Sequence, residues 1–394
     1  MPVPVKSSYN GKSIYRPHHQ ANKVESEVPS YKYLTPQSGQ PSGAWKNSGH
    51  FLDYIIPSKS IETLQGQMFR FELNNGGSAF EAPCTPLWLE RVEVSIGTEL
   101  VETVYNQDML NETVGFLSLD ELDSLNEVLK CSPTGGLDTT ANLPAGSSYA
   151  YLPFKCFLNS ARLYLLTLED QVKFRVYFTP QFFGANSGAD NGIKLSQLTL
   201  ILTEGKGGGK AVQEVAHKSG ITYGVVIRQR FNQQVSRTSG SKNIVDLTGL
   251  NGNSAGLIVY ANAGVNSGAN DQDRQDTFNR YDIPDLTVLD QMGSKITERL
   301  EGDWVKAFLW KDQIGSPFPA HENTATYLMP FADSFRHSVE TGQHTGERKL
   351  TGNEKIELGE ADSTETWNLT ITNYRYASLV FFDNKLVRVV RNFD

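Results

Sequence analysis

The sequence predicts an all-β chain made of two similar β-sandwich domains in tandem. Three elements recur in the same order in both halves: a hairpin centred on glycine, a short helix, and a strand entry that reads Tyr-Leu-(Met)-Pro-Phe. Each half also holds roughly seven to nine runs with the alternation typical of strands, separated by turn residues. This pattern is typical of a sandwich or a jelly roll rather than of a parallel sheet.

The paired hairpins are the strongest sign of a duplication. In residues 88–105, apolar and polar side chains alternate on both sides of Gly97. Residues 285–300 repeat the pattern around Gly293: an apolar residue, glycine, a hydroxyl residue, a charged residue and an aliphatic residue. We predict that both glycines are turn residues at the same place in two related domains.

The N-terminal segment, residues 1–47, differs from the rest of the chain. It contains six prolines and shows no sustained periodicity. It holds six basic and two acidic residues, a net charge of +4. Residues 48–394 must therefore carry −12 to give the total of −8. Such a segment cannot bury enough apolar surface to fold alone. We expect an extended basic arm that becomes ordered through contacts with other subunits. The alternative is a disordered tail.

The first domain is predicted to span residues 48–204. A capping box, Ser118 followed by Glu121, precedes apolar residues at helical spacing and predicts a helix over 118–130. The strands of this half, besides the hairpin, are predicted from residue 51 onward and at 68–73, 151–154, 161–166, 172–179 and 195–202.

A linker over residues 205–222, which includes a possible short helix at 210–218, joins this domain to a second one at 223–394. The glycine-rich run 204–210 lacks the spacing of a phosphate-binding loop. A short helix is expected at 303–309. The strands of the second half are predicted at 224–229, 243–247, 256–261, 327–331, 366–372, 377–383 and 386–391.

We find no motif that carries chemistry, and we predict no catalytic, cofactor-binding or metal-binding residue and no enzymatic activity. The seven histidines form neither His-x-His nor His-Glu-x-x-His. His337 and His344 lie in a polar stretch and are expected to be solvated. Cys156 has no histidine near it in sequence and is expected to be a buried thiol. Carboxylate pairs such as Glu354 and Glu357 are expected on an acidic surface.

Composition limits the remaining classes. The net charge of −8 argues against a protein that coats nucleic acid over its whole surface. No run of about 18 apolar residues is present that would cross a membrane as a helix. The N-terminus lacks the apolar region of a secretory signal, and the three cysteines are expected to be reduced.

Several stretches resemble one family over about residues 50–394. They are Arg-Phe-Glu-Leu-Asn-Asn at 70–75, the two sides of the first hairpin at 89–94 and 97–102, Tyr-Leu-Met-Pro-Phe at 327–331, the glycine-bounded loop 342–346, and residues 369–384. Together with the tandem domains and the basic arm, they are similar to the double jelly-roll major capsid proteins of tailless icosahedral DNA viruses. These include membrane-containing phages, adenovirus-like and polinton-like viruses, and virophages.

The resemblance implies two tandem eight-stranded jelly-roll β-sandwiches, with short helices in connecting loops and an extended N-terminal arm. It implies a major capsid protein that forms a homotrimer, a pseudo-hexameric capsomer, and tiles an icosahedral shell. Its partners would be neighbouring capsomers and penton or minor capsid proteins. The arm would meet the genome or an internal membrane. Localisation would be the virion capsid, assembled in the host cell interior, with 131–149 and 264–279 as outward loops.

Two other functions stay open from the sequence. One is a two-domain β-sandwich protein that binds or cleaves carbohydrate, which would need an aromatic-lined groove with polar groups. The other is a trimeric viral receptor-binding protein, which would be elongated where a capsomer is flat.

Overall fold

We describe the fold from a computed structural model of the chain. The structure describes residues 6–9, 12–15, 28–39, 51–74, 80–82, 85–113, 116, 141–143, 146–161, 163, 165–178, 195–206, 222–263, 283–305, 309–315, 326–360, 365–383 and 385–391.

The first roll consists of two four-stranded antiparallel sheets. One has the order β10-β5-β12-β3 and is called the β3 sheet below; the other has the order β4-β11-β7-β8 and is called the β8 sheet. The eight strands are β3 (Val28–Leu34), β4 (Phe51–Ile56), β5 (Thr63–Asn74), β7 (Leu89–Ile96), β8 (Glu99–Tyr105), β10 (Ser147–Phe154), β11 (Val172–Phe178) and β12 (Leu195–Lys206).

The second roll repeats this arrangement. The order β18-β15-β21-β13 forms the β13 sheet, and the order β14-β20-β16-β17 forms the β17 sheet. The strands are β13 (Thr222–Arg237), β14 (Asn243–Asp246), β15 (Asn251–Ala263), β16 (Asp285–Leu289), β17 (Leu300–Glu301), β18 (Thr326–Pro330), β20 (Lys355–Leu358) and β21 (Glu365–Phe382).

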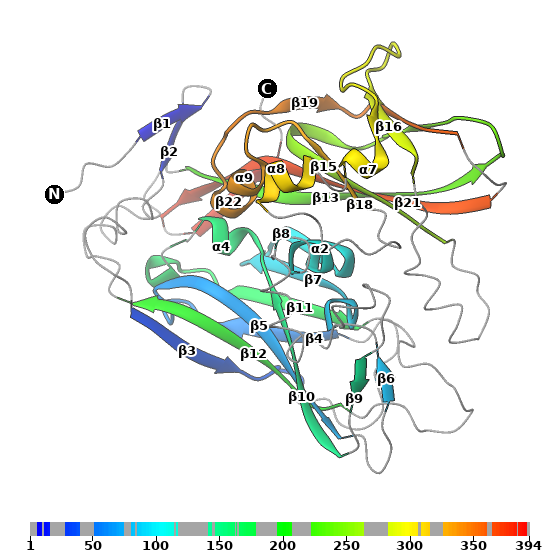
Figure 1. The fold of residues 1–394 in the computed structure, drawn as a ribbon. Coiled ribbons are helices and arrows are strands. Elements are labelled where there is room, and N and C mark those ends of the chain that lie inside the picture. The colour runs from blue at the N-terminus through cyan, green and yellow to red at the C-terminus, as the bar shows by residue number, and fades with distance from the viewer. Residues whose placement is uncertain are drawn as a thin grey trace.

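Both rolls have one strand order. If the strands of each roll are numbered one to eight along the chain, the sheets read six-three-eight-one and two-seven-four-five in both. The two rolls lie one above the other in Figure 1. The predicted hairpins join the fourth and fifth strands in each roll, β7 to β8 and β16 to β17. The duplication and the jelly-roll fold predicted from the sequence are therefore confirmed.

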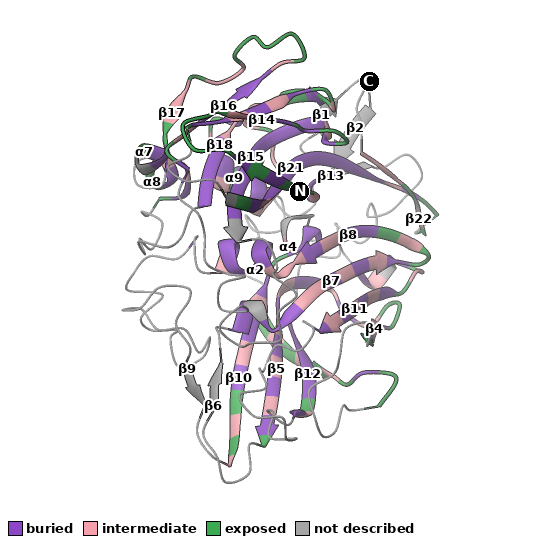
Figure 2. Cartoon of the chain, turned by 90° about the vertical axis from the view of Figure 1, so that its right-hand side faces the viewer, coloured by how far each residue is buried: buried purple, intermediate pink, exposed green. Residues whose placement is uncertain are grey.

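Alternation along the strands builds the cores. In β5 the side chains of Phe69 and Phe71 are fully buried between the two sheets, while Arg70 between them lies on the outer face. Figure 2 shows this alternation of burial along β5 and β10. Removing such apolar side chains from water is the main stabilising contribution to a fold of this kind, roughly 1.5–3 kcal/mol per large side chain.

Smaller elements decorate the rolls. Strands β1 and β2 form a hairpin beside β13, β6 pairs with β9, β19 pairs with β15, and β22 pairs with β21. These strands are β1 (Lys6–Tyr9), β2 (Lys12–Tyr15), β6 (Phe80–Ala82), β9 (Ala141–Leu143), β19 (Arg348–Thr351) and β22 (Lys385–Val390). The helices are η1 (Thr85–Leu87), α2 (Asn106–Thr113), α4 (Phe157–Ala161), η2 (Leu165–Thr167), α7 (Gly302–Trp304), α8 (Trp310–Ile314) and α9 (Phe335–Thr341).

Two predicted elements are wrong. The described residues of the expected strand 161–166 do not form one: α4 ends at Ala161, η2 begins at Leu165, and Leu163 and Leu165 are buried without strand pairing. The strands expected at 366–372 and 377–383 are one strand, β21, whose residues from Glu365 to Val380 pair without a break with the whole of β13. Residues 373–376, between the two expected strands, also pair with β13, so the ladder continues.

Other expectations meet the limits of the described residues. The predicted helices at 118–130 and 210–218, the loop 264–279 and most of the loop 131–149 lie outside them. Residues 28–34, which the sequence places in the N-terminal arm, form β3 and pair with β12. The domain boundaries at residues 47, 204 and 222 stay a prediction. Within the described residues, no helix is long and apolar enough to span a bilayer.

Candidate functional site: the interface between the two rolls

The two rolls meet through different surfaces: the back of the second roll, which is the outer face of its β13 sheet, lies on the front of the first roll, which is β8 with α2. The outer face of the second roll's β13 sheet packs against β8 and α4 of the first roll, and side chains of β13 and β21 bond to α2. Figure 1 shows α2, α4 and β8 between the two rolls. The face that the second roll presents here is the even-numbered side of β13 and β21, which includes Arg228 and Tyr374.

A buried ion-pair cluster lies at the centre of this interface. Arg228 of β13 donates from Nη1 to Glu102 Oε1 of β8 at 2.5 Å, and from Nε to Glu112 Oε1 of α2 at 2.7 Å. Its side chain is 5% exposed, and those of Glu102 and Glu112 are 0% and 2% exposed. Glu102 also accepts hydrogen bonds from the backbone N–H groups of Phe157 and Arg228. A buried charge is tolerated only with such complete pairing.

Further hydrogen bonds extend the cluster across the interface. The hydroxyl of Thr372 in β21 donates to Asp108 Oδ1 of α2 at 2.6 Å, and the hydroxyl of Tyr374 donates to Glu112 Oε1 at 2.9 Å. Asp108 stands in the first turn of α2 and its other oxygen accepts the Tyr105 N–H. A carboxylate is favourable at that end of a helix. The bonds of Thr372 and Tyr374 thus join the two rolls, and the bond from Tyr105 holds the start of α2, which carries both acids.

Burial and charge pull the pKa values of this cluster in opposite directions. Burial raises the pKa of Glu102 and of Asp108 above their ordinary values, although Arg228 counteracts this in both. Burial lowers the pKa of the Arg228 guanidinium, but Glu102 and Glu112 more than offset this, and the pKa lies well above its usual value. Arg228 therefore stays charged at any physiological pH.

Apolar contacts surround the charged centre. The buried core of the first roll continues without a break into side chains of the second, including Val226, Ile258 and Leu328. Across the interface, Phe116 and Trp310 meet edge to face with ring centroids 6.3 Å apart. Arg230 of β13 lies over the ring of Tyr105 at 4.3 Å. Burial of this kind supplies the favourable free energy, while the ions set the relative position of the rolls.

A pocket of about 280 Å³ opens beside the cluster. Its rim carries an ion pair between Lys155 Nζ and Glu340 Oε1 at 3.0 Å, which again joins the two rolls. Burial alone would raise the pKa of Glu340, but Lys155 and Arg336 lower it overall. The lining residues are Gln65, Lys155, Cys156, Asn159, Val226, Arg228, Val339, Glu340 and Tyr374.

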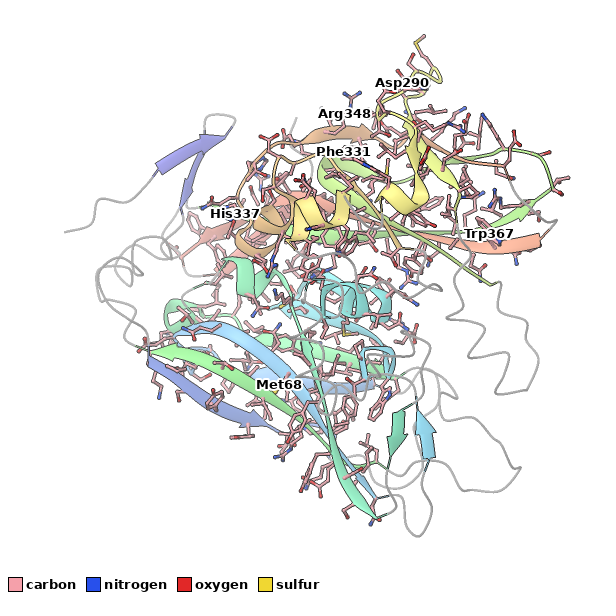
Figure 3. The ribbon with its side chains drawn as sticks, in the orientation of Figure 1. Met68, Asp290, Phe331, His337, Arg348 and Trp367 are labelled. Atoms are coloured by element: carbon pink, nitrogen blue, oxygen red, sulfur yellow. The ribbon has the colours of Figure 1, made fainter. Side chains whose placement is uncertain are left out.

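The residues that the sequence singled out for chemistry have structural contacts. His337 Nε2 lies 2.9 Å from Gln343 Oε1, and Figure 3 shows His337 on α9. His344 pairs with Glu347 at 3.0 Å and stacks on Tyr376 with ring centroids 3.6 Å apart. Both histidines are exposed, as the sequence predicts, and each also contacts a neighbouring protein group. Within the residues that the structure describes, no group of three or more metal-ligating side chains is present.

Two further residues singled out in the sequence have definite places. Cys156 is buried as predicted, and burial raises the pKa of its thiol to about 12. Glu354 is 5% exposed and accepts the backbone N–H groups of Thr351 and Gly352, so this acid shapes a turn and is not a surface residue.

Sequence reasoning did not find the ion-pair cluster. Glu102 lies in the predicted hairpin 88–105 and Arg228 in the strand predicted at 224–229, and neither pattern indicates a buried ion pair. One signal is present: a period of two places Arg228 and Arg230 on the same strand face as the apolar Val226. The partners could not be identified, because Glu102 and Arg228 are 126 positions apart.

Comparison with known proteins identifies the architecture. No family model and no curated sequence matches the chain. Among solved structures, the capsid of PBCV-1 virus has 14% identity and a TM-score of 0.68, with 92% of this chain and 98% of that chain covered. The Faustovirus major capsid protein has 9% identity and a TM-score of 0.66, with 91% of each chain covered. The chain is a double jelly roll.

A third structure, that of the Sputnik virophage, supports the same fold. It has 9% identity and a TM-score of 0.55, with 94% of this chain and 90% of that chain covered. The double jelly roll is thus matched over nearly its whole length, which includes both rolls and the interface between them. The identities are too low for individual residues to be transferred, so the roles of Arg228, Glu102 and Glu112 rest on the contacts described above.

Proposed function

We propose that this protein is a major capsid protein that trimerises into pseudo-hexameric capsomers and tiles an icosahedral virus shell. The observation that carries the proposal is the repetition of one roll twice in a single chain, with the two copies packed front to back. Three such chains present six similar rolls, which is the outline that a six-neighbour tile needs. The likeness to capsid proteins over about nine-tenths of the chain supports it.

The interface chemistry fits a structural role. A tile must keep its two rolls in one relative position, and a fully paired buried cluster such as Arg228 with Glu102 and Glu112 penalises any other position, because each ion would lose its partner. We infer that the chain has no enzymatic activity of its own and that its location is the virion capsid, assembled in the host cell interior.

The proposed partners follow from this role. They are two further copies in the trimer, neighbouring capsomers, and penton or minor capsid proteins. Residues 1–27, which precede β3 of the first roll, hold four basic and two acidic residues, a net charge of +2 against −10 for the rest, and this favours contact with the genome or an internal membrane on the inner face.

The test is the mass and shape of the purified full-length chain. We expect a particle of three chains by light scattering and flat pseudo-hexagonal particles in negative-stain images. A monodisperse monomer contradicts the proposal. Elongated rods in the images would instead indicate a receptor-binding protein, and binding on a glycan array or hydrolysis of a polysaccharide panel would indicate a carbohydrate-directed protein.

A further inference from the structure

The contact between the two rolls has a front and a back. The back is the outer face of the second roll's β13 sheet, and the front is the first roll's fifth strand, β8, with the helix α2 that follows it. A contact between two different surfaces of similar units can repeat from unit to unit. For the contact to repeat between chains, the first roll must have a matching back and the second roll a matching front.

The first roll has the matching back, and the described chain leaves it uncovered. The outer face of the β3 sheet carries Tyr33 and Tyr149, which are 61% and 50% exposed, and Tyr31, which is also 61% exposed. Met68 is on this face too, and Figure 3 places it on the side of the first roll turned away from the second roll. Large aromatic side chains exposed together on one sheet face indicate a protein interface.

This face also has the same chemistry as its counterpart. The guanidinium of Arg70 lies over the rings of Tyr33 and Tyr149 at 5.9 and 5.6 Å, as Arg228 lies over Tyr374 at 5.6 Å. The difference is in the acids. Arg228 has two carboxylates, whereas within the described residues Arg70 has no ion pair and its buried Nε has no hydrogen-bond acceptor.

The second roll has the matching front. Its fifth strand is β17, followed by α7, in the positions that β8 and α2 occupy in the first roll. There Glu301 is exposed, and it has no ion pair within the part of the chain that the structure describes; Trp304, three residues on, is 44% exposed. The edge thus offers a carboxylate and a large aromatic ring, as β8 offers Glu102.

We propose that the outer face of the β3 sheet in one copy binds the β17–α7 edge of a second copy, with Arg70 paired to Glu301. The contact between chains then repeats the contact within a chain, so that rolls follow one another front to back, and three chains close a ring of six. This inference rests on the proposed trimer and names the surfaces that form it. The opposite charges and the exposed aromatic residues favour a second copy of this chain over another partner.

The test compares charge-reversed variants of the full-length chain by sedimentation velocity over a range of concentrations. Arg70→Glu places like charges at the contact and is expected to weaken trimer formation by at least about thirtyfold. The double variant Arg70→Glu with Glu301→Arg restores the opposite pair and is expected to recover most of the affinity. Arg348→Glu, at an exposed arginine of β19, is the matched control and is expected to trimerise as the wild type does.

The outcomes separate this inference from the proposed function. A wild-type trimer that Arg70→Glu leaves unchanged overturns the proposed surface and leaves the capsid function standing. A double variant no tighter than Arg70→Glu overturns the pairing with Glu301. A wild-type monomer overturns both. Recovery in the double variant also excludes a folding defect as the cause of the Arg70→Glu effect, because a misfolded first roll would not be repaired by a change in the second.

Discussion

Arg228 and Glu112 form a two-point pair across the two rolls. Nε of the arginine lies 2.7 Å from Oε1 of the glutamate, and Nη2 lies 2.5 Å from Oε2. This fork geometry fixes direction as well as distance, which a single contact does not. Because Arg228 belongs to β13 and Glu112 to α2, the pair couples the orientation of one roll to that of the other.

Removal of Arg228 is expected to destabilise the chain strongly. Arg228→Met leaves Glu102 and Glu112 buried without their cation, which typically costs about 3–5 kcal/mol. Arg175→Met is the matched control: its pair with Asp53 is also bidentate, but the side chains are 30% and 21% exposed, so we expect about 1 kcal/mol or less. The measurement is urea denaturation of both variants. Equal losses would show that the buried cluster has no special weight.

Acid is expected to weaken the pair of Asp53 and Arg175. The hydrogen bond from Arg175 holds the pKa of Asp53 below its ordinary value of 3.8, against an opposing effect of burial. A lowered folded-state pKa gives a stabilisation that is complete above the unfolded value and is lost as the pH falls below 3.8. Asp53→Asn should therefore be less stable than the wild type at pH 6, and the gap should narrow towards pH 3.

Thermal unfolding at a series of pH values measures that gap. Asp246→Asn serves as the control, because the Asp246 side chain is 71% exposed and its single contact with Lys355 is 3.6 Å long. This variant should lose less stability than Asp53→Asn at pH 6. A gap for Asp53→Asn that stays constant from pH 6 to pH 3 would rule out ionisation as its cause.

The two turn glycines are expected to differ in their tolerance of alanine. Both have left-handed backbone, with φ of 59° at Gly97 and 83° at Gly293, so alanine costs roughly 1–2 kcal/mol at either. A Cβ at Gly293 meets nothing within 4 Å, whereas a Cβ at Gly97 would lie 3.1 Å from Asp170 Oδ1. Asp170 accepts the Leu386 N–H at 2.8 Å, a bond worth about 1 kcal/mol.

Gly97→Ala should consequently be the more destabilising variant, by about the free energy of that hydrogen bond. Chemical denaturation of the two variants side by side provides the comparison. If Gly293→Ala lowers the free energy of unfolding as much as Gly97→Ala does, then the Asp170 side chain moves aside without loss and the crowding at the first hairpin has no energetic consequence.

Cys156 is expected to resist alkylation in the folded protein. Its pKa of about 12 leaves a thiolate fraction at pH 8 about a thousandfold below that of a thiol at its ordinary value of 9.0. Mass spectrometry after iodoacetamide treatment, in a variant with Cys84→Ser and Cys131→Ser, measures the single remaining thiol. Labelling should require denaturant. Rapid labelling of the native chain would mean that the pocket beside the interface opens to reagent.

Alternation of side chains was sufficient to predict most of the strands. Val172–Phe178 and Leu195–Lys206 lie where the sequence predicts strands, because a half-buried strand must alternate to place one face in the core. The run at 161–166 failed because a short apolar stretch reads the same whether it is buried as a strand or as a turn. The boundary expected between 372 and 377 is wrong because residues 373–376 also pair with β13, and alternation alone does not show where a ladder ends.

The duplication and the absence of familiar catalytic motifs could be read from the chain alone, since hairpins, caps and glycine turns are local and repeat as local patterns. The tertiary structure decided which residues meet. Arg228 reaches Glu102 and Glu112 only because the back of one roll packs on the front of the other, and Arg70 is left facing outward by the same arrangement. Periodicity records which side of a strand is buried, but it carries no information about what buries it, because that depends on contacts between residues more than a hundred positions apart.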